Sequence, residues 1–221
     1  MGGHDGRVSV AASSHPRLAG ATHRLLDDLA AHHAPTAAHS CRVAALAGLV
    51  CDAIGAPPAL RARLRAAALL HDVGKLAVPA ALLSSVRRLS AHEWDLMRSH
   101  AHAGAHLVGA DPALRDLAPA VAAVHERFGG GGYPANLAGE AIPWSARVLA
   151  VCDAYDAMRD PGRRWRAPMG HAEAAAHLRA GAPAQFDPDA VELVLRADAR
   201  GRATDEHHTV RAGCLQVPSS A

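Results

Sequence analysis

Lysine is almost absent from this chain, because Lys75 is the only one and the other 22 basic residues are arginine. Aromatic residues are also scarce, at 3% of the sequence. A core must therefore be built from Ala, Leu and Val, without the aromatic side chains that strands favour. Alanine is the best helix former. The composition predicts an all-α fold and argues against a sheet.

Disulfides, structural zinc and membrane spans are not indicated either. The four cysteines form no CxxC pair, and Cys41 and Cys51 lie about 15 Å apart on one predicted helix, beyond disulfide reach. The N-terminus has no apolar signal region, and no stretch approaches the ~18 apolar residues of a membrane span. The formal charge is only +2 and the arginines are scattered. We expect a cytoplasmic protein without a membrane or nucleic-acid partner.

The length suits one well-buried domain and is too short for two large ones. The ends, residues 1–15 and 199–221, are rich in Gly, Ser and His without periodicity, which predicts disorder. Residues 16–198 are predicted to form one bundle of seven to eight helices. The expected helices are 17–33, 36–54, 58–70, 91–109, 111–125, one that begins at Pro143, 170–180 and 187–197.

The pentapeptide His71-Asp72-Val73-Gly74-Lys75 carries the main functional signal. An adjacent His-Asp pair supplies an imidazole and a carboxylate that can bridge two metal ions. The lone lysine provides a compact ammonium, which suits contact with a phosphate beside metal ligands. Other predicted helices offer further metal-capable side chains: His39, His100, His125 and Asp153. Imidazoles and carboxylates without thiolates suit Fe, Mn, Zn, Co or Ni.

These residues stand in six blocks that resemble the HD-GYP phosphodiesterases of the HD superfamily, over about residues 35–195. The blocks follow the family's order and separations: 39–43, 68–79, 89–104, 125–134, 147–157 and 186–188. A single His-Asp dipeptide is unspecific, whereas six ordered blocks are specific. The resemblance implies an all-α HD-domain bundle. It also implies a metal-dependent phosphodiesterase that hydrolyses cyclic di-GMP to pGpG or GMP through a metal-bound hydroxide.

The resemblance also implies a role for each site residue. The ligands would form two sets that share one carboxylate: His39, His71, Asp72 and Asp153 for one metal, and Asp72, His100 and His125 for the other. Asp72 and Lys75 would be catalytic, orienting the hydroxide and stabilising phosphate charge. The residues implied to contact substrate are Lys75, Arg163, Arg166, Gly132 and Tyr133.

Four positions depart from the family pattern. Val124 stands where the family has the first of two adjacent histidines, and Gly129 stands where its DGxGYP motif has aspartate. Pro35 replaces a glutamate that binds a third metal in some members, and Arg164 replaces a proline between the two expected phosphate-binding arginines. We therefore expect two divalent ions at most, Fe or Mn, with the second held more weakly.

Two alternatives stay open at this point. One is an HD-superfamily phosphohydrolase that acts on another nucleotide or phosphate ester. The other is a non-catalytic module that binds a cyclic dinucleotide or a protein, which Val124 and Gly129 would suit. The glycine-rich loop (residues 129–134) would either approach a phosphate or serve as a slack connection. A partner protein that supplies the signal and a homodimer are both compatible with the sequence.

Several other polar residues are expected to take no part in the site. His102 and His106 are spaced i,i+4 but are expected on a solvated helix face. Asp156, one turn after Asp153, is expected to be structural, and Val124 is expected to pack in the core.

Overall fold

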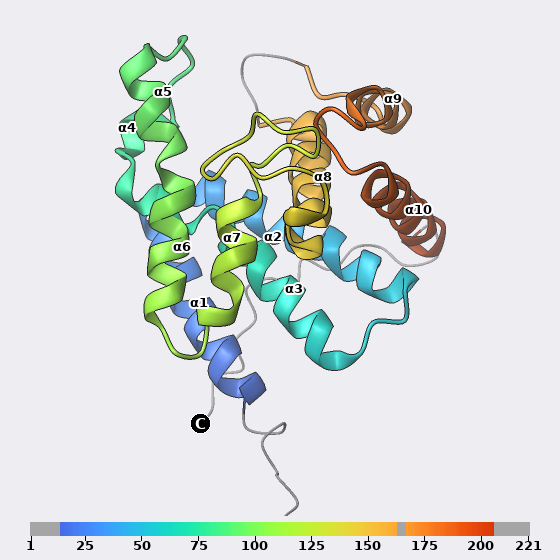
Figure 1. Ribbon diagram of the computed structural model, residues 1–221, viewed down its shortest axis with the longest axis horizontal. Helices are drawn as coiled ribbons and strands as arrows, with labels where there is room; N and C mark the ends of the chain where they lie inside the picture. Colours follow the sequence, from blue (N-terminus) through green and yellow to red (C-terminus); the bar gives the residue numbers. More distant parts are fainter. Residues whose placement is uncertain (1–13, 163–166, 206–221) are drawn as a thin grey trace, which may run out of the picture.

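The computed structural model describes residues 14–162 and 167–205, and within these ranges the chain contains helices and no strand (Figure 1). The all-α prediction is confirmed. The α-helices are α1 (Ser14–His32), α2 (Ala34–Ala53), α3 (Pro58–Leu70), α4 (Ala80–Leu83), α5 (Ala91–Arg98), α6 (His100–Ala110), α7 (Ala118–Ala123), α8 (Trp144–Arg159), α9 (His171–Gly181) and α10 (Pro188–Asp205). The 3-10 helices are η1 (Val73–Ala77), η2 (Arg115–Leu117) and η3 (Gly139–Ala141).

Helix α2 is the central element and packs against α1, α3, α8 and α10 (Figure 1). Its sequence carries Ala, Leu and Val on more than one face, which is typical of a helix with protein on several sides. Val43 and Val50 are fully buried there, beside Leu29 of α1 and Leu64 of α3. The core is built of small and aliphatic side chains, as the composition predicts.

The helix expected over residues 91–109 is interrupted, so this prediction is wrong in its middle. Ser90 and Glu93 form the expected capping box at the start of α5. At Ser99 the N–H still donates to the Asp95 carbonyl at 3.0 Å, and the hydroxyl adds a bond to the Leu96 carbonyl at 2.8 Å, a local contact that often bends a helix. The chain restarts as α6 at His100, and this residue is buried.

The continuous helix expected over residues 111–125 is also wrong. Asp111 does cap the segment, since its Oδ1 accepts from the Ala113 N–H at 2.8 Å. The segment then forms a 3-10 turn before α7 begins. Pro119 lies in the first turn of α7 and has no N–H, so it starts a new helix rather than continuing one.

The described chain extends past the predicted boundary at residue 198, because α10 continues to Asp205. Asp198 is buried and accepts a hydrogen bond from the Tyr155 hydroxyl at 2.7 Å. Gly201 is buried against Leu49 of α2, where an added Cβ would lie 2.7 Å from the leucine side chain. These contacts stabilise the last turns of a segment that lacks clear periodicity. Disorder of the outer tails stays a prediction.

No helix in the described part of the chain combines the length and the apolarity that crossing a bilayer requires.

Candidate metal centre

The ends of several helices bring the predicted ligands together. His39 comes from α2, His71 and Asp72 follow α3, and His100 begins α6. His125 lies two residues beyond the end of α7, and Asp153 lies on α8. All six residues expected from the sequence therefore converge on one region of the molecule, although they span more than 100 positions of the chain.

Close backbone packing at Gly74 places the His-Asp turn against α6. A Cβ at this glycine would lie 1.9 Å from the His100 carbonyl oxygen and 2.4 Å from the Gly104 nitrogen. Only glycine fits where two backbones approach so closely. This contact holds Asp72 beside the first turn of α6, where His100 lies.

The first cluster of donor atoms contains His39, His71 and Asp72, whose ligand atoms lie within 4.8 Å of one another. His71 is fully buried, and its Nδ1 donates to the Ala68 carbonyl at 2.8 Å. That hydrogen bond leaves a lone pair on Nε2, and this atom is buried without a partner. Its distance to Asp72 Oδ2 is 3.4 Å. A ring fixed at Nδ1 by a carbonyl is the usual arrangement of a metal-ligating histidine.

The second cluster contains Asp72, His100 and His125 and is equally tight. The Nε2 atoms of the two histidines lie 2.8 Å apart, and His100 Nε2 is 3.4 Å from Asp72 Oδ1. The Nδ1 of His100 donates to the Met97 carbonyl, which turns its Nε2 toward the cluster. Burial lowers the pKa of His100, and burial together with the neighbouring His100 lowers the pKa of His125 to about 4. Both rings are therefore neutral near pH 7 and keep lone pairs for a metal.

The Asp72 carboxylate lies between the two clusters. Its Oδ2 faces His71 and accepts from Lys75 Nζ at 2.6 Å, while its Oδ1 faces His100 and is buried without a hydrogen bond. Burial raises the pKa of this carboxyl, but the charge of Lys75 and the adjacent histidines hold the pKa well below its usual range. The result is an ionised, buried carboxylate with one oxygen directed at each histidine cluster.

These features fit divalent metal ions. Two buried polar atoms, His71 Nε2 and Asp72 Oδ1, have no hydrogen-bond partner within the described chain, although leaving such atoms without a hydrogen bond is costly. The Nε2 atoms of His100 and His125 lie 2.8 Å apart, so at most one of them can donate to the other. A metal ion in each cluster would satisfy the lone pairs there.

Asp156 takes a role that the sequence analysis did not assign to it. His39 Nδ1 donates to Asp156 Oδ2 at 2.7 Å, while His39 Nε2 lies 2.9 Å from Asp153 Oδ1. Arg42 binds the Asp156 carboxylate through two nitrogens, at 2.8 and 2.9 Å. Asp156 thus orients the ring of a predicted ligand. The i,i+3 spacing from Asp153 was the available signal, because it places both carboxylates on one face of α8.

The glycine-rich loop is anchored at several points, so its interpretation as a slack connection is wrong. The buried Glu126 carboxylate accepts from the backbone N–H groups of Ala135 at 2.7 Å and Leu137 at 3.1 Å. The Gly129 N–H donates to the Ala184 carbonyl at 3.2 Å. An added Cβ at Gly129 would lie 3.0 Å from that same oxygen. Backbone contacts thus support the loop at the position where the family has aspartate.

The loop also brings Tyr133 onto the second cluster. Its ring stacks on His125, with centroids 5.1 Å apart and an interplanar angle of 16°. Gly132 allows this approach, because a Cβ there would lie 2.4 Å from the Arg127 nitrogen. Burial raises the pKa of Tyr133 to about 12, so the phenol keeps its proton and can donate a hydrogen bond.

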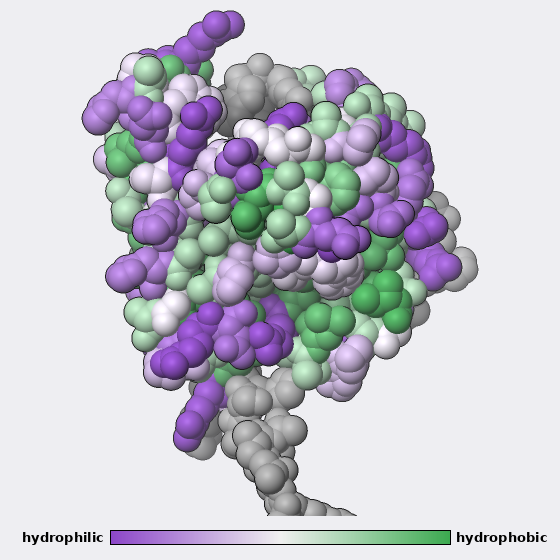
Figure 2. Space-filling view, in the orientation of Figure 1, coloured by the Kyte–Doolittle hydropathy of each residue, from purple (hydrophilic) through white to green (hydrophobic). Residues whose placement is uncertain are grey.

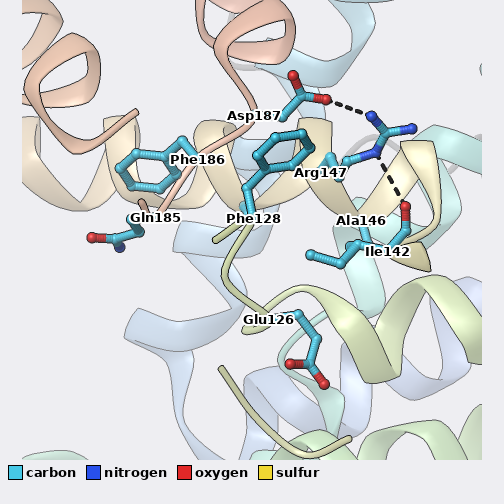
Figure 3. A pocket seen from close by; sticks show the side chains of 9 residues that line it. Glu126, Phe128, Ile142, Ala146, Arg147, Gln185, Phe186 and Asp187 are labelled. Atoms are coloured by element: carbon cyan, nitrogen blue, oxygen red, sulfur yellow. Dashed lines mark hydrogen bonds and ion pairs between the residues drawn. The ribbon is translucent and has the colours of Figure 1, made fainter. Parts of the chain in front are cut away.

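A small hollow behind the loop has a structural role. Figure 3 shows the Phe128 ring between Phe186 and the Arg147 side chain. Arg147 donates to Asp187 Oδ2 at 2.6 Å and to the Ile142 carbonyl at 3.1 Å. The Arg147–Asp187 pair ties α8 to the residue before α10, and the Glu126 carboxylate in the same lining holds the loop backbone.

The remaining predicted residues lie as follows. Lys75 is 21% exposed beside Asp72. Arg163 and Arg166 lie outside the described residues. His102 and His106 are exposed, as expected, and Val124 is 2% exposed in the core, as expected.

Asp156→Asn is expected to weaken metal binding about 10- to 100-fold, the scale of losing a carboxylate that supports a ligating histidine. The variant keeps the side-chain size but removes the charge that faces His39 Nδ1. Manganese affinity measured by calorimetry checks this. Asp160→Asn is the matched control, since Asp160 also binds Arg42 but does not contact His39. Equal manganese affinity in the two variants would contradict the role given to Asp156.

Comparison with known proteins gives consistent matches. A family model described as HD domain matches residues 24–190. A cyclic di-GMP phosphodiesterase response regulator from Xanthomonas campestris is 35% identical over 175 residues, which cover 75% of this chain and 44% of that protein. A 3'3'-cGAMP-specific phosphodiesterase from Vibrio cholerae is 32% identical over 175 residues, covering 78% of this chain and 33% of that protein.

Among solved structures, the phosphodiesterase HD domain from L. monocytogenes in complex with cyclic-di-AMP matches with a TM-score of 0.60. It is 17% identical and covers 88% of this chain and 100% of that chain, which establishes a shared fold. The matched segment spans less than half the length of the two curated relatives named above.

Proposed function

The chain belongs to the HD domain family, as a member of its HD-GYP group, and from this we propose that it is a metal-dependent phosphodiesterase that hydrolyses cyclic di-GMP to pGpG or GMP. The observation that carries the proposal is the position of Asp72. One of its oxygens faces His71 and the other faces His100, and the free lone pairs around it belong to buried ligand atoms. That arrangement suits a carboxylate shared by two metal ions.

We propose two divalent ions at most, with iron or manganese favoured by a donor set of imidazoles and carboxylates without thiolates. When bound, such ions activate water as a nucleophile and offset the negative charge of a phosphodiester. His39, His71, Asp72 and Asp153 would hold one ion, and Asp72, His100 and His125 the other. Val124 offers no ligand to the second site, which supports weaker binding there.

Lys75 is proposed to act both on Asp72, a proposed metal ligand, and on the substrate. Its ammonium lies 2.6 Å from Asp72 and keeps this carboxylate ionised, and its partial exposure leaves donors for a substrate phosphate. The Tyr133 hydroxyl and the Gly132 backbone are proposed substrate contacts from the glycine-rich loop. Arg163 and Arg166 stay proposed phosphate contacts on the strength of the family resemblance.

The curated relatives support a cyclic dinucleotide as substrate, because they are named for cyclic di-GMP or 3'3'-cGAMP. A phosphohydrolase that acts on another nucleotide is the second candidate, and the same metal centre would serve it. A non-catalytic module is less well supported, since a module without metal would leave buried ligand atoms unpaired. We further propose a cytoplasmic protein that receives its signal from a partner protein or within a homodimer.

The test is cyclic di-GMP turnover by protein loaded with Mn(II) or Fe(II) without oxygen, with 3'3'-cGAMP and cyclic di-AMP as comparisons. We expect linear product that a chelator abolishes and added metal restores. The matched variants are His100→Ala, which should lose turnover, and His102→Ala, an exposed histidine on the same helix, which should retain it. No product from metal-loaded protein would refute the phosphodiesterase and favour another phosphate ester or a receptor role.

Metal affinity is expected to rise about tenfold per pH unit between pH 6.5 and 8.5, which corresponds to one released proton. In the metal-free protein burial lowers the pKa of His39, but its hydrogen bonds to Asp153 and Asp156 outweigh burial and raise the pKa to about 9. The raised pKa means that protonated His39 stabilises the metal-free fold below its ordinary pKa, and that this contribution is lost as pH rises through about 9.

A metal at His39 Nε2 must displace that proton, whereas His100 and His125 are already neutral in this range. Calorimetric titration with Mn(II) in two buffers of different ionisation enthalpy would count the protons. A pH-independent affinity with no proton release would show that His39 is not a ligand.

A further inference from the structure

Helix α5 carries an exposed aromatic side chain, Trp94, that is not part of the hydrophobic core. Trp94 is 50% exposed, although it lies on the lobe of α4 and α5 that projects at the upper left and is mostly hydrophilic (Figure 2). It lines a hollow of about 300 Å³ with Ala91, Asp95 and Arg98. Within the described ranges, the Asp95 carboxylate and the Trp94 indole N–H have no hydrogen-bond or ion-pair partner. An aromatic face and a free carboxylate therefore line the same open hollow.

This hollow is connected to the metal centre through stacked side chains. Arg98 lies one helical turn after Trp94, on the same face of α5. Its guanidinium lies over the Tyr133 ring, 5.8 Å from the centroid, and Tyr133 stacks on His125. Arg98, which lines the hollow, is thus linked through Tyr133 to His125, a predicted metal ligand.

We infer that the hollow is a subsite for one guanine base of the substrate, with Trp94 stacking on the base and Asp95 selecting guanine. This inference rests on the proposed function, since it assumes a cyclic dinucleotide whose phosphate lies at the metal centre. The volume lies at the lower end of the range for small-molecule sites, which fits one base of a larger ligand. Base stacking on an aromatic side chain contributes substantially to affinity and tolerates any base.

Selectivity comes from the carboxylate. Guanine presents two adjacent donors, N1–H and N2–H, to a carboxylate that has only acceptors. Adenine presents one donor and a lone pair at the equivalent edge, so it would place an acceptor against the Asp95 oxygen. A site built around a hydrogen-bonding group rejects the analogue that leaves this group unpaired. Arg98 would close the far side of the hollow through its cation–π contact with Tyr133.

The experiment compares kcat/KM for cyclic di-GMP with that for bis(4-nitrophenyl) phosphate, a phosphodiester without bases. Trp94→Leu should lower the ratio about 10-fold or more, and Trp94→Phe, which keeps a ring, should restore most of it. Asp95→Asn should lower the preference for cyclic di-GMP over cyclic di-AMP about 10-fold. His92→Ala is the matched control, because His92 is exposed on α5 and does not line the hollow.

A binding measurement separates this inference from the proposed function. Cyclic di-GMP should quench the indole fluorescence of the double variant Trp144→Phe/Trp165→Phe, in which Trp94 is the one tryptophan left. If the wild type hydrolyses neither phosphodiester, the proposed function fails, and quenching that depends on Trp94 still supports the subsite. If both phosphodiesters are hydrolysed and neither the ratio nor the quenching responds to Trp94, the subsite is refuted while the phosphodiesterase stands.

Discussion

Asp72→Ala is expected to remove bound metal and to lower cyclic di-GMP turnover by at least about 10³-fold, the scale of losing one member of a catalytic unit. The expectation follows from its position, since its two oxygens face the two histidine clusters and Asp72 is the residue that both groups of possible ligand atoms in the described chain share. The substitution also leaves the Lys75 ammonium without its partner. Neither proposed metal site would then keep its full set of ligands.

Metal content by elemental analysis and turnover by product separation would check this expectation together. Asp116→Ala is the matched control, because that carboxylate is exposed and its ion-pair partner is Arg63, which is not one of the proposed ligands. Circular dichroism would establish that both variants are folded. An Asp72→Ala protein that retains stoichiometric metal and near-normal turnover would overturn the shared-carboxylate arrangement.

Gly74→Ala is expected to destabilise the fold by at least about 3 kcal/mol, because the added methyl group would overlap the backbone of α6. Neither the His100 carbonyl nor the Gly104 nitrogen can move without displacing the helix. The expected fall in melting temperature is about 6–12 °C for a chain of this length. Metal content should fall as well, since Asp72 and His100 would be pushed apart.

Gly48→Ala is the matched control for this substitution. Gly48 lies within α2, and a Cβ there would meet no atom within 4 Å. Alanine in a helix interior should stabilise the protein by about 0.5–1 kcal/mol. Thermal unfolding of the two variants should therefore shift in opposite directions, and equal shifts would show that the close contact at Gly74 does not hold the centre together.

The sequence was informative wherever chemistry and periodicity agreed. The convergence of the proposed ligand histidines could be predicted because each occurs at an inward or terminal position of a helix and in a motif of known order. The breaks at Ser99 and Pro119 could not, since both segments have helical periodicity and the interruption depends on a local hydrogen bond and on a missing N–H. Periodicity alone cannot distinguish one long helix from two shorter ones.

The supporting residues of the site were harder to predict than the proposed ligands. Asp156 acts through His39, and Glu126 acts through backbone N–H groups of the loop, so neither has a spacing that points to a metal. The loop is rich in glycine and has Gly129 where the family has aspartate, and these two features together suggested a slack connection. The structure shows backbone contacts to Ala184 in its place, and such long-range contacts leave no local pattern in the sequence.

The single lysine gives the molecule an internal reporter of opening. A protease that cuts only after lysine has one target bond in the whole sequence. That bond lies inside η1, the 3-10 helix that follows Asp72 and contains the Gly74 contact with α6. Cleavage there requires η1 to unfold and move away from the candidate metal centre. One cut, yielding two fragments, would measure how often this region opens, and ligands that hold Asp72 and His71 in place should slow it.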